Sequence, residues 1–316
     1  VVGLAMNSTV RNCRYDGTVN FYGKFSGGVV GVSYDSVIEN CAVEKESTVN
    51  VYYHFSGGVV GRAVGADNMI KGCSFEGNFT SVGYCSGGIV GQLLGGAVED
   101  CVLGSYAYFG ADKHAVGGIV GSAQPLNDIM VKNCASYGTI RGAYSVGGIV
   151  GYAGIGQGAD SDKDLMLNAS GDVTIRDCAF VRGSVTATSA FSKGYALAGG
   201  IIGWGYGDAS QNITVAGCYS RPGLIQTTYG SNVNGVLAGI SAFQHNVVAV
   251  IENCYSSFTN TDMLVCSEQA ADGLRWVAGV HVRSCATTTI RNCYSDTSLP
   301  VGSQNKGDEA GCCQYN

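Results

Sequence analysis

The hexapeptide SGGVVG at residues 26–31 returns as SGGVVG at 56–61, SGGIVG at 86–91, VGGIVG at 116–121 and VGGIVG at 146–151. Each copy begins thirty residues after the one before it. A period of this length predicts a repeat architecture, in which each repeat is one structural unit that packs on its neighbours. The repeat therefore decides the fold before any single motif is considered.

A second recurring motif is a tetrapeptide that ends in cysteine, from VRNC at 10–13 to IRNC at 290–293. Its first residue is Val or Ile, its third is Asn, Asp or Gly, and its fourth is always Cys. Because Asn, Asp and Gly tolerate a left-handed backbone, we expect a bend there that turns the first residue and the cysteine inward. The nine cysteines are thus predicted to form one structural column of buried free thiols: Cys13, Cys41, Cys73, Cys101, Cys134, Cys178, Cys218, Cys254 and Cys293.

Short runs rich in Val, Ile, Thr and aromatic residues separate the two motifs, as in GTVNF at 17–21 and GTIRG at 138–142. Such runs indicate β-strands. The sequence therefore predicts an all-β protein, a parallel β-helix (β-solenoid) of about nine coils with roughly three short strands per coil. The glycine pair suits a corner where a side chain would collide with the next coil. An antiparallel stack of hairpins is the alternative, but its Asn-Gly and Asp-Gly turns occur out of step with the repeat.

The regularity of the repeat divides the chain into three regions. Residues 1–151 are expected to form a regular solenoid of 30-residue repeats, and residues 152–299 its continuation with longer loops. Residues 300–316 are expected to be a C-terminal tail or cap. Extra residues in a solenoid emerge as loops on one side of the stack.

The bulk composition excludes two classes of partner. The formal net charge is −6 and no basic run occurs, so nucleic acid is not an expected partner. No apolar run reaches the roughly 18 residues needed to cross a bilayer, so no membrane insertion is expected.

With both motifs in view, the chain resembles the GLUG-motif repeat proteins, whose repeats combine I-x-N-C-Y, a short G-x-I strand and V-G-G-I-V-G. The matching stretches are VIENCYSS at 250–257, TIRNCYSD at 289–296 and SYGTIRGAYSVGGIVG at 136–151. The resemblance implies a bacterial surface or secreted protein with an adhesin-like β-solenoid. Similar repeats also lie beside catalytic domains in IgA-protease-type enzymes, but this sequence lacks any catalytic motif of those enzymes.

Five cysteines lie off the column: Cys85, Cys266, Cys285, Cys312 and Cys313. Any disulfide is expected to involve these residues, and their pairing cannot be read from the sequence. The acidic stretch with Asp160, Asp162 and Asp164 alternates like the opening of a calcium loop, but Leu165 occupies the position where such a loop needs glycine. We expect a solvated acidic loop there, with calcium as the weaker alternative and no other cofactor.

No catalytic constellation is evident. The four histidines are interpreted as lying at different phases of the repeat, in surface or loop positions: His54, His114, His245 and His281. No motif for a nucleophile, a metalloprotease or a phosphate-binding loop occurs. The chain is therefore predicted not to be an enzyme.

Aromatic residues are the best candidates for a binding surface. Clusters such as FYGKF at 21–25 and VYYHF at 51–55 alternate along predicted strands, so about half of their side chains should face outward. The ligand-surface candidates are Tyr22, Tyr53, Tyr108, Trp204 and Tyr206. Outward rings could stack on sugar rings or contact a protein.

These features predict a noncatalytic, extracellular or cell-surface repeat module, adhesive or stalk-like, that binds a host or microbial glycan or a surface protein. One alternative is an accessory solenoid of a larger secreted enzyme that acts on proteins or polysaccharides. Another is a filament subunit that associates end to end, because open strand edges invite pairing.

Overall fold

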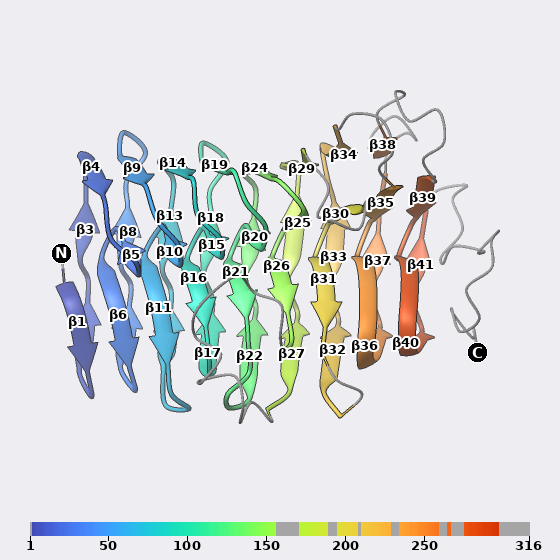
Figure 1. Ribbon diagram of the computed structural model, residues 1–316, viewed down its shortest axis with the longest axis horizontal. Coiled ribbons are helices and arrows are strands. Elements are labelled where there is room, and N and C mark those ends of the chain that lie inside the picture. The colour runs from blue at the N-terminus through green and yellow to red at the C-terminus, as the bar shows by residue number, and fades with distance from the viewer. Residues whose placement is uncertain are drawn as a thin grey trace.

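The computed structural model describes residues 2–155, 171–188, 195–207, 210–228, 234–258, 264–266 and 275–296. The described residues form 41 β-strands and no helix. The strands wind around one axis into a stack of coils, with the N-terminal coil at one end and the C-terminal coil at the other (Figure 1). All strand pairs are parallel, which confirms a parallel β-solenoid.

Sheet A has 16 strands in two rows that meet in its last coils. The first row is β1 (Val2–Met6), β6 (Val30–Tyr34), β11 (Val60–Val64), β16 (Val90–Leu93), β21 (Val120–Ala123), β26 (Val150–Ala153), β31 (Ile202–Tyr206), β36 (Ser241–Glu252) and β40 (His281–Arg291). The second row is β2 (Thr9–Arg11), β7 (Val37–Glu39), β12 (Met69–Lys71), β17 (Gly96–Glu99), β22 (Ile129–Lys132), β27 (Val173–Arg176) and β32 (Asn212–Ala216). Strands β36 and β40 run through both rows, and their pairing shifts register between His245 and Val248.

The other three sheets each take one short strand from successive coils. Sheet B is β3 (Arg14–Tyr15), β8 (Ala42–Val43), β13 (Ser74–Phe75), β18 (Val102–Leu103), β23 (Ala135–Ser136), β28 (Ala179–Val181), β33 (Tyr219–Arg221), β37 (Tyr255–Ser256) and β41 (Tyr294–Ser295). Sheet C is β4 (Thr18–Phe21), β9 (Thr48–Val51), β14 (Asn78–Ser81), β19 (Tyr108–Ala111), β24 (Thr139–Gly142), β29 (Ser184–Ala187), β34 (Leu224–Thr227) and β38 (Leu264–Cys266). Sheet D is β5 (Ser26–Gly27), β10 (Ser56–Gly57), β15 (Ser86–Gly87), β20 (Val116–Gly117), β25 (Ser145–Gly147), β30 (Tyr195–Gly199), β35 (Asn234–Ala238) and β39 (Arg275–Ala278).

Each regular coil contains five strands, where the sequence predicts about three. The second coil, for example, consists of β6, β7, β8, β9 and β10. Sheets B and D contain many strands of only two residues, and so short a strand shows no alternation in the sequence. The nine strands of sheet B confirm the predicted number of coils. The sheets continue across residue 151, and residues 300–316 lie outside the described residues, so the division into regions stays a prediction.

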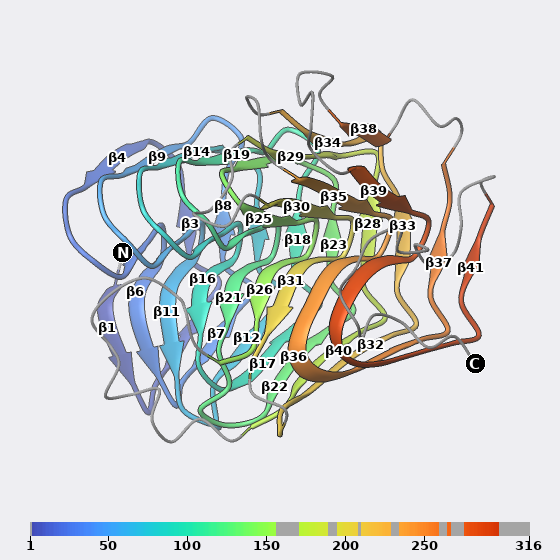
Figure 2. The ribbon, with the colours of Figure 1, turned by 45° about the vertical axis from the view of Figure 1, so that its right-hand side comes forward.

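The glycine pair of the hexapeptide forms the corner between sheets D and A. A Cβ atom on Gly58 would lie 2.1 Å from the carbonyl oxygen of Gly88 and 2.4 Å from the ring of Phe75. The second residue after the pair is a buried valine in the first copies, where Val30, Val60 and Val90 stack in register. A corner of this kind recurs once per coil, and Figure 2 shows the stacked coils in an oblique view.

The third residue of the cysteine motif has a left-handed backbone in all nine copies, with φ between 52° and 63°. The residue two positions before that bend and the cysteine directly after it therefore both face the core, as in the second coil, where Ile38 and Cys41 are fully buried. Each central thiol contacts backbone oxygens; the Cys101 Sγ lies 3.1 Å from the carbonyl of Glu99 and 3.6 Å from that of Ile70 in the preceding coil. The bends place the cysteines in one column along the wall of the core.

Candidate functional site

The outer face of sheet C presents polar and aromatic side chains in register and is a candidate binding surface. Along its strands β4, β9, β14, β19 and β24 the burial alternates, because successive side chains of a strand point to opposite faces. The inward residues fill the core: Val19, Val49, Phe79, Phe109 and Ile140. The outward residues form two columns in register: Thr18, Thr48, Asn78, Tyr108 and Thr139, and beside them Asn20, Asn50, Thr80, Gly110 and Arg141.

Hydrogen bonds between coils hold the second column in place. The Asn50 Nδ2 donates to the Asn20 Oδ1 at 2.9 Å, and the Thr80 Oγ1 donates to the Asn50 Oδ1 at 2.7 Å. These bonds join three strands and fix the side chains before any ligand arrives. A surface that is already ordered loses less conformational entropy on binding.

Tyr108 leans along its own strand over Gly110. A Cβ atom on Gly110 would lie 3.0–3.3 Å from the Tyr108 ring and its hydroxyl oxygen. The absence of a side chain at residue 110 therefore lets the ring lie close to the sheet, where it is 37% exposed. An exposed ring held against a rigid surface is a suitable platform for an apolar face of a ligand.

Tyr108 and Gly110 form part of a shallow cleft of about 260 Å³ on this face, the sheet C cleft. It is lined by Asn50, Val51, Tyr52, Thr80, Ser81, Val82, Tyr108, Gly110, Ala111, Asp112 and Arg141. Asp112 and Arg141 are both exposed, and neither forms an ion pair with any described residue. Hydroxyl, amide, guanidinium and carboxylate groups thus line the cleft together with two aromatic rings, those of Tyr52 and Tyr108.

Tyr52, which also lines the cleft, stacks on Tyr22 with ring centroids 4.8 Å apart and planes within 6°. Tyr22 is 75% exposed, so this pair stands out from the surface at the ends of β4 and β9. Tyr53 is also exposed, and its ring lies 4.8 Å from that of His54 and 5.7 Å from the Lys24 Nζ. Three of the five aromatic residues singled out in the sequence are therefore on the surface.

The other two aromatic candidates, Trp204 and Tyr206, are not exposed on the surface, so the sequence prediction is wrong for them. Trp204 is only 6% exposed, and its ring packs at 5.3 Å from those of both Tyr144 and Tyr152. Tyr206 is half-buried against the same group, with its ring 5.0 Å from that of Trp204. Trp204 is part of a second, smaller hydrophobic cluster with residues from sheets A and D, separate from the main core, and Tyr206 packs against it. Burial there leaves Trp204 unable to present its ring to a ligand.

The prediction of surface or loop positions for all four histidines is wrong in part, because His114 and His281 are buried. His54 and His114 lie two repeats apart, and the ring of Tyr84 stands between theirs at 4.7 Å and 4.5 Å. Burial lowers the pKa of His114 to about 4, and electrostatic interactions with His54 and Lys113 add to the effect. His281 is fully buried, and burial lowers its pKa to about 4 as well. These two rings are therefore neutral parts of the packing at pH 7.

All ten cysteines whose side chains are placed in the described part of the chain are free thiols. Burial raises the pKa of Cys101 well above its usual value and that of Cys85 to about 12, so neither is a reactive thiolate. Cys85 lies off the column, in the second hydrophobic cluster. The side chains of Cys266 and Cys285, and all of Cys312 and Cys313, lie outside the described residues.

The proposed calcium ligands Asp160, Asp162 and Asp164 lie outside the described residues. Among the residues that are described, no group of three or more His, Cys, Asp or Glu side chains is arranged to hold a metal ion. The same part of the chain contains no helix long and apolar enough to cross a membrane.

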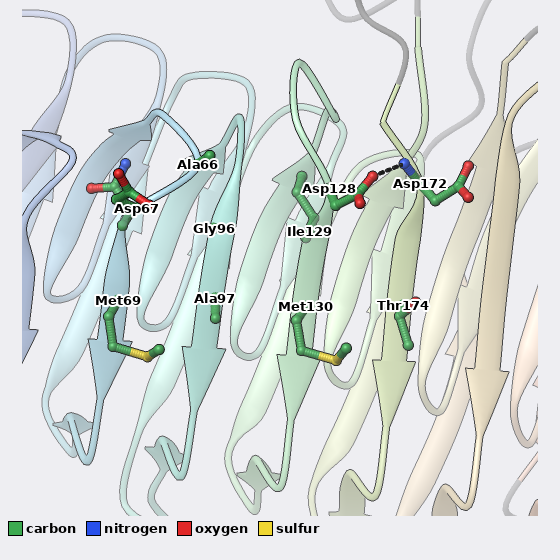
Figure 3. A pocket seen from close by; sticks show the side chains of 11 residues that line it. Ala66, Asp67, Met69, Gly96, Ala97, Asp128, Ile129, Met130, Asp172 and Thr174 are labelled. Atoms are coloured by element: carbon green, nitrogen blue, oxygen red, sulfur yellow. Dashed lines mark hydrogen bonds between the residues drawn. The ribbon is translucent and has the colours of Figure 1, made fainter.

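A larger, acidic groove of about 560 Å³ lies where the loops lead into the second row of sheet A (Figure 3). Its floor consists of outward side chains from four neighbouring strands, Met69, Ala97, Met130 and Thr174. Asp67, Asp128 and Asp172 lie at its edge. The Asp128 Oδ1 accepts a hydrogen bond from the Asp172 backbone nitrogen at 3.0 Å, and the Asp172 Oδ1 accepts one from that of Asn212 at 3.1 Å. Two of these carboxylates thus join successive loops, and no aromatic ring lines the groove.

Several residues of the sheet C cleft are not identified by the sequence reasoning. Asn50, Thr80 and Arg141 occur within short strands that resemble the strands of every other coil. The available signal is the alternation in TVN at 18–20, TVN at 48–50 and NFT at 78–80, which places polar residues outward at a 30-residue interval.

Comparison of the chain with protein-family models, curated proteins and solved structures gives no match. The resemblance to GLUG-motif repeats therefore stays a prediction that rests on the quoted stretches of sequence.

Proposed function

We propose that the chain is a noncatalytic repeat module of a cell-surface or secreted protein that binds a glycan through the sheet C cleft. The observation that carries the proposal is the Tyr108 ring over Gly110, with amide, hydroxyl and charged groups around it. Sugars present apolar C–H faces to aromatic rings and hydroxyl groups to polar side chains, so both parts of the cleft have a counterpart in a glycan. The surface or secreted location rests on the resemblance to GLUG-motif repeats alone.

The solenoid suits an adhesive role because its stacked coils hold equivalent outward residues of sheet C at fixed positions. Backbone hydrogen bonds join every coil to the next, so the cleft residues from β9, β14, β19 and β24 keep their relative positions. Binding sites on regular strands are positioned more accurately than sites on loops. The two alternatives, an accessory region of a larger enzyme and end-to-end assembly, stay predictions.

The test is a glycan array followed by titration calorimetry with the best-bound glycan. Tyr108→Ala removes the ring and is expected to weaken binding about fivefold, because an aromatic contact contributes roughly 1 kcal/mol. Gly110→Val keeps the ring but displaces it from the sheet, so it should weaken binding too.

Tyr34→Ala is the matched control, because Tyr34 is equally exposed but lies at the end of β6 in sheet A. It should leave binding unchanged. Wild-type chain that binds no glycan, or a Tyr108→Ala variant that binds as well as the wild type, would refute the proposal. Circular dichroism of each variant would exclude loss of fold as the cause.

A further inference from the structure

The outer face of sheet C extends beyond the cleft in one direction, along the solenoid axis. Equivalent outward residues on neighbouring strands follow one another at about 4.8 Å, the spacing of hydrogen-bonded strands. From β4 to β24 there are four such spacings, roughly 19 Å in all. A ligand that lies across the strands therefore meets the same kind of group at each step, whereas a ligand parallel to a strand soon leaves the sheet.

The groups along this path are uncharged. The outward residues of β4, β9, β14 and β19 are Thr18, Asn20, Thr48, Asn50, Asn78, Thr80, Tyr108 and Gly110. The first charges are Arg141 on β24 and Asp112 just after β19, and their formal charges cancel. A face of this composition matches the hydroxyl groups of a neutral sugar chain, and it offers no excess positive charge for sulfates or uronates.

The amide column still has hydrogen-bonding capacity for a ligand. The Asn50 Nδ2 uses one of its two N–H groups toward Asn20, and the amide nitrogen of Asn20 donates to no described residue. The Thr80 hydroxyl donates to Asn50 and keeps its lone pairs. Hydrogen-bond donors and acceptors thus remain available on three successive strands, and the bonds among Asn20, Asn50 and Thr80 already fix their positions.

Resting on the proposed function, we propose that the ligand is an uncharged, linear polysaccharide that lies across the strands of sheet C, parallel to the solenoid axis. One sugar stacks on Tyr108 next to Arg141 and Asp112. The chain then continues over the hydroxyl and amide groups of β14, β9 and β4.

The experiment measures affinity as a function of oligosaccharide length and charge. Neutral β-1,4-linked gluco-, manno- and xylo-oligosaccharides of one to six units are titrated into the full chain, with oligogalacturonates as the anionic comparison, at low and physiological salt. The affinity for a neutral series should rise up to about four units, the number of strand spacings along the face, and then level off. It should change little with salt, because no net charge is neutralised on binding.

A distant variant tests the orientation. Asn20 lies three strands from Tyr108, about 14 Å along the axis. Asn20→Ala should weaken binding of a tetrasaccharide about threefold to tenfold, the loss of one polar contact, and leave a disaccharide unaffected. Thr9→Ala, an exposed threonine on sheet A, is the control and should change neither.

Two results would overturn the inference while leaving a glycan-binding function intact: tighter, salt-sensitive binding of the oligogalacturonates, or a monosaccharide that binds as tightly as the tetrasaccharide. In both cases Tyr108→Ala would still weaken binding. If Tyr108→Ala has no effect on any of these sugars, the proposed function itself fails.

Discussion

Replacing a single corner glycine by alanine should destabilise the whole solenoid. In Gly58→Ala the new methyl group would lie 2.1 Å from the Gly88 carbonyl oxygen and 2.4 Å from a carbon of Phe75. Real Cβ atoms essentially never approach closer than 3.0 Å, so the two coils must separate by roughly 1 Å or the fully buried Phe75 ring must move. Separation would stretch the backbone hydrogen bonds from Gly58 N to Gly87 O and from Val60 N to Ile89 O, now 2.9 Å and 2.8 Å long.

Overpacking of a core costs about 1–3 kcal/mol, and weakening two backbone hydrogen bonds adds about 1 kcal/mol each. The free energy of unfolding should therefore fall by about 3–5 kcal/mol in Gly58→Ala. Gly23→Ala is the matched control, because no atom lies within 4 Å of a Cβ there and its φ is not in the left-handed region. It should be neutral or stabilise the protein by up to about 1 kcal/mol.

Urea denaturation followed by far-ultraviolet circular dichroism measures both variants. Because coils of a solenoid interact with their nearest neighbours, hydrogen exchange should show the largest loss of protection in the coils next to residue 58. Equal stability of Gly58→Ala and Gly23→Ala would refute the corner geometry.

Three further predictions concern buried groups of the stack. The buried His281 is neutral, since its Nδ1 donates to the Ser241 carbonyl at 2.9 Å and its pKa is lowered to about 4. In the unfolded chain this histidine titrates near pH 6.5, so its contribution to stability is complete above pH 6.5. As the pH falls toward 4, the free energy of unfolding should decrease by about 3 kcal/mol. In His281→Asn, urea denaturation at a series of pH values should show a smaller decrease over this range. Asn133 has a left-handed backbone, with φ 52°. Asn133→Ala should therefore destabilise the folded protein by about 1 kcal/mol, and Asn133→Gly should destabilise it less. A higher thermal midpoint for Asn133→Ala than for Asn133→Gly would contradict the left-handed bend. The buried Cys101 thiol, with its raised pKa, should react with iodoacetamide at pH 8 only after unfolding, and peptide mass spectrometry that finds it alkylated in the folded protein would contradict its burial.

The sequence predicts the solenoid because two positions in every coil accept few residue types. The corner excludes side chains, which leaves glycine, and the bend before cysteine requires a left-handed backbone, which favours Asn, Asp and Gly. Both requirements recur once per coil and so produce visible periods in the sequence.

A second left-handed bend is not visible in this way. It occurs at Phe25, Phe55, Cys85 and Ala115, whose φ angles lie between 56° and 63°. These residue types do not favour a left-handed backbone, so the bend cannot be predicted from local conformational preference. The surrounding packing imposes it, since Phe55, Cys85 and Ala115 are buried in the second hydrophobic cluster.

The candidate site is only partly predictable for a related reason. Tyr22 and Tyr108 stand out as aromatic residues in strand-like runs, and both are on the outer face of sheet C or at its edge. Trp204 stands out equally and is buried, because residues of the second cluster cover the outward side of β31. Alternation along a strand distinguishes two faces, but it does not reveal which outer face is covered by the rest of the chain.

The central claim is that like residues stack on like residues around a single axis, and the sulfur atoms test it most directly. An anomalous difference map from crystals of the protein, recorded at a long wavelength, locates every ordered sulfur independently of any assumed fold. Nine cysteine peaks in one file, at intervals of about 4.8 Å, are the expected result. Cysteine peaks dispersed among separate lobes would contradict it.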